Sequence, residues 1–112
     1  MGKAHVFGFA TAERVFNLPC QFHLHMVADA TDALASAATT SLGFTTYTSN
    51  WQDIINDPAI GLVNITAPNA LHKEIALAAI AAGKHVYCEK PLAPSAHDSL
   101  EMTVAAAVSY TH

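Results

Sequence analysis

The chain has 112 residues, enough for one small domain, and hydrophobic residues make up 52% of it. Charged residues make up only 12%, well below the roughly 25% of an average soluble chain, so we expect the rest of a larger protein to cover much of its surface. The net charge of −4 and the scattered basic residues argue against a nucleic-acid partner. No apolar run approaches the roughly 20 residues that span a membrane.

The first half of the chain alternates between helical and β-prone segments. The pattern predicts a helix over 2–17, a strand over 22–28, a helix over 33–41 and a short β-prone stretch over 44–47. Thr31 or Asp32 can cap the second helix, and Gly43 suits its C-terminal end.

The second half continues the alternation with short connections. It predicts a short helix over 51–56, a strand over 62–66, a long helix that follows Asn69 and ends at Gly83, a strand over 85–88, and a last helix over 96–109 that Ser95 caps. Such regular alternation favours a parallel sheet with right-handed crossovers. We therefore predict the doubly wound, Rossmann-like α/β class, in which ligands bind beyond the carboxyl ends of the strands.

Asp29 closes the strand predicted over 22–28. A carboxylate at this place can accept hydrogen bonds from the ribose hydroxyls of an adenosine dinucleotide. It would repel a 2′-phosphate, and no Lys or Arg lies between Arg14 and Lys73 to attract one, which favours NAD over NADP. Read alone, Asp29 is equally consistent with a turn or helix-cap residue.

The segment Thr66-Ala67-Pro68-Asn69 leaves the strand over 62–66 with a hydroxyl, a rigid turn and an amide. Such a turn could line the nicotinamide half of a dinucleotide, or it could be an ordinary strand-to-helix connection. His72 lies one turn further on and, by itself, is typical of a surface or helix-end histidine.

Glu89-Lys90-Pro91 directly follows the strand over 85–88. A charged pair after a buried strand is costly unless it is paired or used. The Lys90 ammonium could donate a hydrogen bond to a substrate hydroxyl and lower the pKa of that hydroxyl. The alternative is a structural Glu–Lys pair at the end of the sheet.

Histidine and cysteine residues give no metal site by their spacing. His23 and His25 share one face of a predicted strand, but no third ligand is evident. Cys20 and Cys88 form no disulfide framework and fit a reducing cytoplasm. The acid Glu89 beside Cys88 disfavours a thiolate there.

Two motifs together resemble a known family. Asn-Ile-Thr-Ala-Pro-Asn over 64–69, then His72, then Gly-Lys-His-Val-Tyr-Cys-Glu-Lys-Pro-Leu over 83–92 is similar to the Gfo/Idh/MocA oxidoreductases. The resemblance runs from Gly2 to about residue 107. It implies an NAD(P)-binding Rossmann domain followed by a C-terminal α/β substrate domain. It also implies hydride transfer at a hydroxyl-bearing carbon of a small-molecule sugar, inositol or related polyol.

The resemblance also implies residue roles. Lys90 matches the catalytic lysine that contacts substrate and nicotinamide, and Asp29 matches the ribose-binding acid. The remaining cofactor-binding positions would be Gly2, as the third glycine of the phosphate loop, Thr66, Pro68, Asn69, His72, Glu89 and Pro91.

Two departures from the family pattern shape the expected domain. The first strand and the first two glycines of Gly-x-Gly-x-x-Gly are absent, and the chain stops before the substrate domain with its Asp and His partners of the lysine. We therefore expect residues 1–112 to be a truncated dinucleotide-binding domain that is poorly folded and inactive when produced alone. The full-length protein is expected to be a cytoplasmic homo-oligomer.

Other functions remain open on the same scaffold. A regulatory or sensor module could bind the dinucleotide without turnover. A different NAD-dependent reaction, such as glycoside cleavage or biliverdin-type reduction, could also use these motifs.

Overall fold

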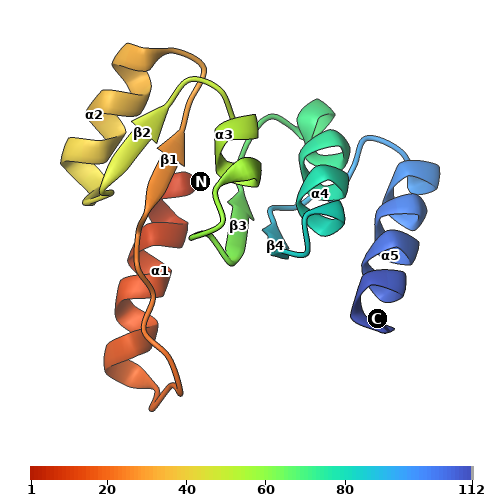
Figure 1. Ribbon diagram of the computed structural model, residues 1–112, viewed down its shortest axis with the longest axis horizontal. Helices are drawn as coiled ribbons and strands as arrows, with labels where there is room; N and C mark the ends of the chain where they lie inside the picture. The colour runs from red at the N-terminus through yellow and green to blue at the C-terminus, as the bar shows by residue number, and fades with distance from the viewer. Residues whose placement is uncertain (112) are drawn as a thin grey trace. The chain divides into compact units, whose positions relative to one another are not determined.

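The computed structural model describes the backbone of residues 1–111 and the side chains of residues 1–109. Helices and strands alternate along the chain, as the sequence predicts (Figure 1). The chain divides into two compact units, Met1–Trp51 and Gln52–His112. Each unit is described by itself below.

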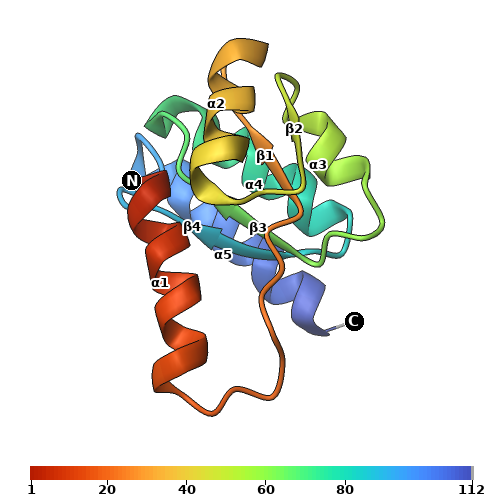
Figure 2. The ribbon, with the colours of Figure 1, turned by 90° about the vertical axis from the view of Figure 1, so that its left-hand side faces the viewer.

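The first unit contains two helices and a pair of parallel strands. Its elements are α1 (Gly2–Val15), β1 (Met26–Ala28), α2 (Asp32–Leu42) and β2 (Thr46–Thr48). β1 and β2 pair in parallel with Met26 opposite Thr46 and Ala28 opposite Thr48. Figure 2 shows the extended connection that leads from the end of α1 to β1.

The ends of α2 follow the capping residues in the sequence. The Thr31 hydroxyl accepts a hydrogen bond from the Leu34 N–H at 3.2 Å, which satisfies a donor that the first turn leaves unpaired. Gly43 ends the helix in the left-handed region with φ 85°, where any side chain would be strained. Both predicted ends of this helix are confirmed.

The strand predicted over 22–28 is shorter in the structure, because β1 begins only at Met26. The Phe22 N–H donates to the carboxylate of Glu13 in α1, and the Phe22 ring lies 4.8 Å from the ring of Phe9. These contacts tie Phe22 to α1, whereas the carbonyls of Leu24 and His25 already accept the N–H groups of Thr45 and Thr46 and lead into the ladder with β2. β2 likewise covers Thr46–Thr48 rather than 44–47.

The second unit contains the other parallel pair. Its elements are α3 (Gln52–Asn56), β3 (Leu62–Ile65), the 3-10 helix η1 (Asn69–Leu71), α4 (His72–Ala81), β4 (His85–Cys88) and α5 (Ala96–Thr111). β3 and β4 pair with Leu62 opposite His85 and Ile65 opposite Cys88. α4 packs against both strands and against α5, which lies beside it in Figure 1.

Most buried hydrophobic side chains belong to the second unit. Among the described side chains they are Ile60, Val63, Ile65, Ile75, Ala76, Ala79, Ala93 and Met102, whereas the first unit buries only Ala35 to the same degree. β3 and α4 therefore form the centre of this core. Within residues 1–111, no helix is long and apolar enough to cross a membrane.

Candidate functional site

Asp29 follows β1 directly and occupies the carboxyl end of that strand, as predicted. Its N–H donates to the Thr48 carbonyl at 3.2 Å, and its Oδ1 accepts the Ala30 N–H at 2.7 Å. The side chain is exposed. One carboxylate oxygen thus organises the local turn, and the other stays available to a ligand. Gly2, the predicted end of a phosphate loop, is the first residue of α1.

The turn after β3 contains the predicted residues Thr66, Pro68 and Asn69. Thr66 is half-buried, whereas Pro68 and Asn69 are exposed. The Pro68 carbonyl accepts the Leu71 N–H at 2.9 Å, which begins η1. The hydroxyl and the amide therefore lie at the carboxyl end of the strand, where the sequence places them.

Lys90 lies just beyond β4 and has an exposed side chain. The Glu89 N–H donates to the Ile65 carbonyl at 2.9 Å, which extends the parallel ladder past β4. The Lys90 N–H donates to Glu89 Oε1 at 3.0 Å. The Glu89 carboxylate thus bonds the Lys90 backbone, and the Lys90 ammonium makes no ion pair with any residue that the structure describes. The Lys90–Pro91 peptide bond is cis.

His72 is the first residue of α4, and its side chain is 0% exposed. His72 thus lies at the end of a helix, as one of the two expectations has it, and the expectation of a surface histidine is wrong. Nε2 lies 2.8 Å from the Ala67 carbonyl oxygen, and Nδ1 lies 3.0 Å from that of Pro91 and 3.3 Å from that of Leu92. The ring thus joins the turn after β3 to the turn after β4, a contact across 19 residues that no local pattern reveals.

Cys88 is half-buried in β4. Burial, and secondly the Glu89 carboxylate, raise the pKa of the Cys88 thiol above its ordinary value. The predicted lack of thiolate character is therefore confirmed.

The two histidines of the first unit lie close to each other. Their ring centroids are 5.9 Å apart, and His23 Nε2 lies 3.2 Å from the Thr45 hydroxyl. Over the part of the chain that the structure describes, no group of three or more His, Cys, Asp or Glu side chains could hold a metal ion.

Lys84 has a structural contact that the sequence did not reveal. Its ammonium donates to the carbonyl oxygens of Asp57 at 2.8 Å and Ile60 at 2.6 Å. These carbonyls belong to the connection between α3 and β3, so Lys84 fixes the approach to the first strand of the pair. Lys84 and Lys90 belong to the same motif, yet among the described residues only the Lys84 ammonium has a partner.

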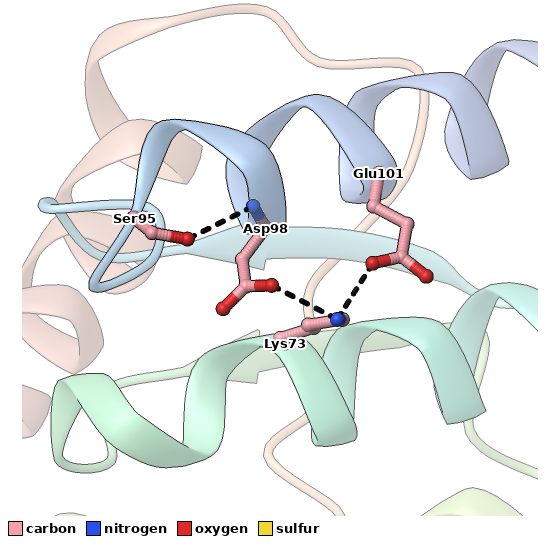
Figure 3. Close-up of polar contacts among 4 residues, drawn as sticks. All are labelled: Lys73, Ser95, Asp98 and Glu101. Atoms are coloured by element: carbon pink, nitrogen blue, oxygen red, sulfur yellow. Dashed lines mark hydrogen bonds and ion pairs between the residues drawn. The ribbon is translucent and has the colours of Figure 1, made fainter.

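Lys73, Asp98 and Glu101 form a second unpredicted contact, between α4 and α5 (Figure 3). The Lys73 Nζ lies 2.9 Å from Asp98 Oδ1 and 2.6 Å from Glu101 Oε2. The hydrogen bond to Glu101, then that to Asp98, raises the pKa of Lys73. The hydrogen bond from Lys73 lowers the pKa of Asp98. The Ser95 hydroxyl accepts the Asp98 N–H at 3.1 Å and caps α5, as predicted.

Known proteins resemble nearly the whole chain. Levoglucosan dehydrogenase of Pseudarthrobacter phenanthrenivorans is 45% identical over 103 residues, which are 91% of this chain and 26% of that enzyme. Inositol 2-dehydrogenase/D-chiro-inositol 3-dehydrogenase of Lactiplantibacillus plantarum is 33% identical over 91% of this chain and 32% of its own length. The chain thus spans about a quarter to a third of these relatives.

The fold agrees with solved structures. A levoglucosan dehydrogenase in complex with NADH and levoglucosan superimposes with a TM-score of 0.92 and 44% identity, over 96% of this chain and 29% of that one. The profile of the Gfo/Idh/MocA family, described as an oxidoreductase family with an NAD-binding Rossmann fold, matches residues 2–109. The parallel strands, the strand-end residues and these matches agree, and the chain belongs to the Gfo/Idh/MocA oxidoreductase family.

Proposed function

We propose that the protein containing this chain transfers hydride between NAD and a hydroxyl-bearing carbon of a sugar, inositol or related polyol. The observation that carries the proposal is Lys90, whose exposed ammonium extends from a backbone that hydrogen bonds hold at the end of β4. The relatives named for levoglucosan and inositol support the substrate class.

The residues present fit a dinucleotide. Asp29 offers an exposed carboxylate with one oxygen outside the local turn, and this oxygen would accept hydrogen bonds from ribose hydroxyls. Its negative charge disfavours a 2′-phosphate, so NAD is preferred to NADP. Thr66, Pro68 and Asn69 would contact the cofactor from the turn after β3, and Glu89 and Pro91 would do so from the turn after β4. NAD, when bound, supplies the group that accepts or returns the hydride.

Lys90 would act on the substrate through hydrogen bonding and charge. Its ammonium would donate to the hydroxyl at the reacting carbon and stabilise negative charge on that oxygen while water or a side chain of the expected substrate domain accepts the hydroxyl proton. Among the described residues the Lys90 ammonium makes no ion pair, so within this part of the chain it does not first have to break one to make this contact.

The test compares the two lysines of one motif in the protein made from the complete coding sequence. Lys90→Ala should lower kcat for polyol oxidation by about 100-fold or more, because it removes a group that stabilises developing charge, and should leave NAD affinity largely intact. Lys84→Ala, the matched control, should retain kcat and lose about 1–3 kcal/mol of stability with its two charged hydrogen bonds. Steady-state kinetics, NAD titration and chemical denaturation measure these effects.

Turnover that survives in Lys90→Ala contradicts the role of Lys90. NAD binding by the wild type without turnover of any polyol supports the sensor alternative. We also propose that the protein is a cytoplasmic homo-oligomer, which light scattering of the purified protein and fractionation of the source cells would test.

A further inference from the structure

His72 is unusual in its surroundings. Among the described side chains it is the one polar side chain that is buried, with 0% exposure. A polar ring removed from water must find partners within the protein. Both of its nitrogens lie within hydrogen-bond distance of backbone carbonyl oxygens. The ring nitrogens thus face the protein backbone and not solvent.

The partners of His72 lie in the two turns that carry the predicted site residues. Ala67 lies between Thr66 and Pro68 in the turn after β3, and Pro91 follows Lys90 in the turn after β4. Carbonyl oxygens only accept hydrogen bonds, so each N–H of the ring donates to one of the two turns. The ring lies between the two turns.

The backbone of Lys90 is consequently fixed on both sides. On one side, the Glu89 N–H bonds the Ile65 carbonyl at 2.9 Å and continues the ladder of β3 and β4. On the other side, the Pro91 carbonyl lies 3.0 Å from His72 Nδ1. The backbone that carries the lysine is held, whereas its ammonium is free.

We propose that His72 is a positioning residue that sets the place of the Lys90 ammonium through the Pro91 carbonyl. The inference rests on the proposed function, because it assumes that Lys90 contacts the substrate. It gives His72 a role in turnover without contact with the substrate or cofactor.

Two substitutions separate the two sides of the ring. The amide of asparagine reaches the position of Nδ1, and the amide of glutamine reaches the position of Nε2. His72→Asn can therefore keep the contact with the Pro91 carbonyl and loses that with Ala67. His72→Gln can keep the contact with the Ala67 carbonyl and loses that with Pro91. Both variants remove the aromatic ring, so each controls for the packing change in the other.

The experiment uses the protein made from the complete coding sequence and measures kcat, NAD affinity, melting temperature and amide hydrogen exchange without cofactor. We expect His72→Gln to lower kcat by about 10- to 100-fold, the effect of misplacing a catalytic group by about 1 Å. His72→Asn should lose clearly less of kcat than His72→Gln, since it keeps the contact that bears on Lys90. Exchange over residues 89–93 should accelerate in His72→Gln alone, with similar melting temperatures for the two variants.

Equal losses of kcat in the two variants, in step with their melting temperatures, overturn the proposal, because they show a role in stability only. Failure of both variants to fold also overturns it, and so does unchanged turnover in both. If the wild type oxidises no polyol, the proposed function fails, and hydrogen exchange still decides whether His72 holds the turn. Exchange that accelerates equally in both variants rejects that contact.

Discussion

At the scale of single residues, side chains of the same type in one motif make different contacts in the folded protein. Lys84 and Lys90 lie in one motif, but the protein's own carbonyl oxygens bind the Lys84 ammonium and leave that of Lys90 exposed. The two carboxylate oxygens of Asp29 differ in the same way. Oδ1 accepts the Ala30 N–H, and the other oxygen lies outside the local turn. The atoms that can bind a ligand are those that make no hydrogen bond within the described part of the protein.

Asp29 provides a prediction about cofactor choice in the complete protein. Asp29→Asn should raise the ratio of kcat/KM with NADP to kcat/KM with NAD by about tenfold or more, equivalent to about 1.4 kcal/mol. The neutral amide keeps an oxygen for the Ala30 N–H but no longer repels a 2′-phosphate. Parallel kinetics with both cofactors measure the ratio.

Asp32→Asn is the control for this experiment. It makes the same change of charge in the first turn of α2 and should leave the ratio unchanged. An equal rise in both variants would indicate a general effect of net charge and contradict a specific role for Asp29.

Local patterns predicted the strand-end residues because parallel strands place their carboxyl ends at one edge of a sheet. They could not predict the burial of His72, because its Pro91 partner lies 19 residues away. Lys73 was missed for a similar reason, as 25 residues separate it from Asp98. Long-range hydrogen bonds follow from the packing of elements, which spacing along the chain does not encode.

At the scale of elements, the two helices of the second unit are joined by both apolar and charged side chains. Met102 of α5 is buried, and Lys73 of α4 bonds Asp98 and Glu101 of α5 on a half-exposed surface. The predicted elements mostly kept their bounds, and β4 matches residue for residue. β1 did not, because it begins four residues later than predicted, and Phe22, where the predicted strand begins, contacts α1.

The ion pairs between α4 and α5 predict how stability depends on pH. The pKa of Asp98 is lowered from 3.8, so its contribution is present above pH 3.8 and is lost as the pH falls through the lower folded value. The pKa of Lys73 is raised from 10.5, so its contribution is present below pH 10.5 and is lost as the pH rises through the higher folded value. Between these limits the Asp98 carboxylate and the Lys73 ammonium both keep their charge.

Chemical denaturation of the complete protein and of Asp98→Asn measures this contribution. The difference in free energy of unfolding should shrink as the pH falls below the ordinary pKa of the carboxyl group. A difference that persists unchanged to pH 2 would contradict the assignment. Ser99→Ala, next to Asp98 in α5, serves as an uncharged control and should show no such dependence.

At the scale of the whole molecule, the two units differ in how much core they contain. Each has a two-stranded parallel sheet, and isolated sheets need more strands or a covering helix for stability. The second unit buries eight of the nine hydrophobic side chains that are withdrawn from solvent among those described, and α1 buries none. Stability within these residues should therefore be unequal.

Hydrogen exchange of the 112-residue polypeptide produced alone would measure this inequality. We expect protection in β3, α4 and β4, where the core lies, and rapid exchange across α1 and β1. Strong protection of α1, or one cooperative transition that protects both units alike, would contradict the expectation.

The bonds of His72 also bear on how the length of the chain can vary among relatives. The ring is attached to a fixed place in α4, and it reaches back to Ala67 and forward to Leu92. An inserted or deleted residue between these points would move one turn away from the ring or rotate the ring out of the core. Insertions and deletions should therefore be rare between residues 67 and 92 and commoner in the long connection between α1 and β1. The contacts of His72 thus fix the number of residues between the two family motifs.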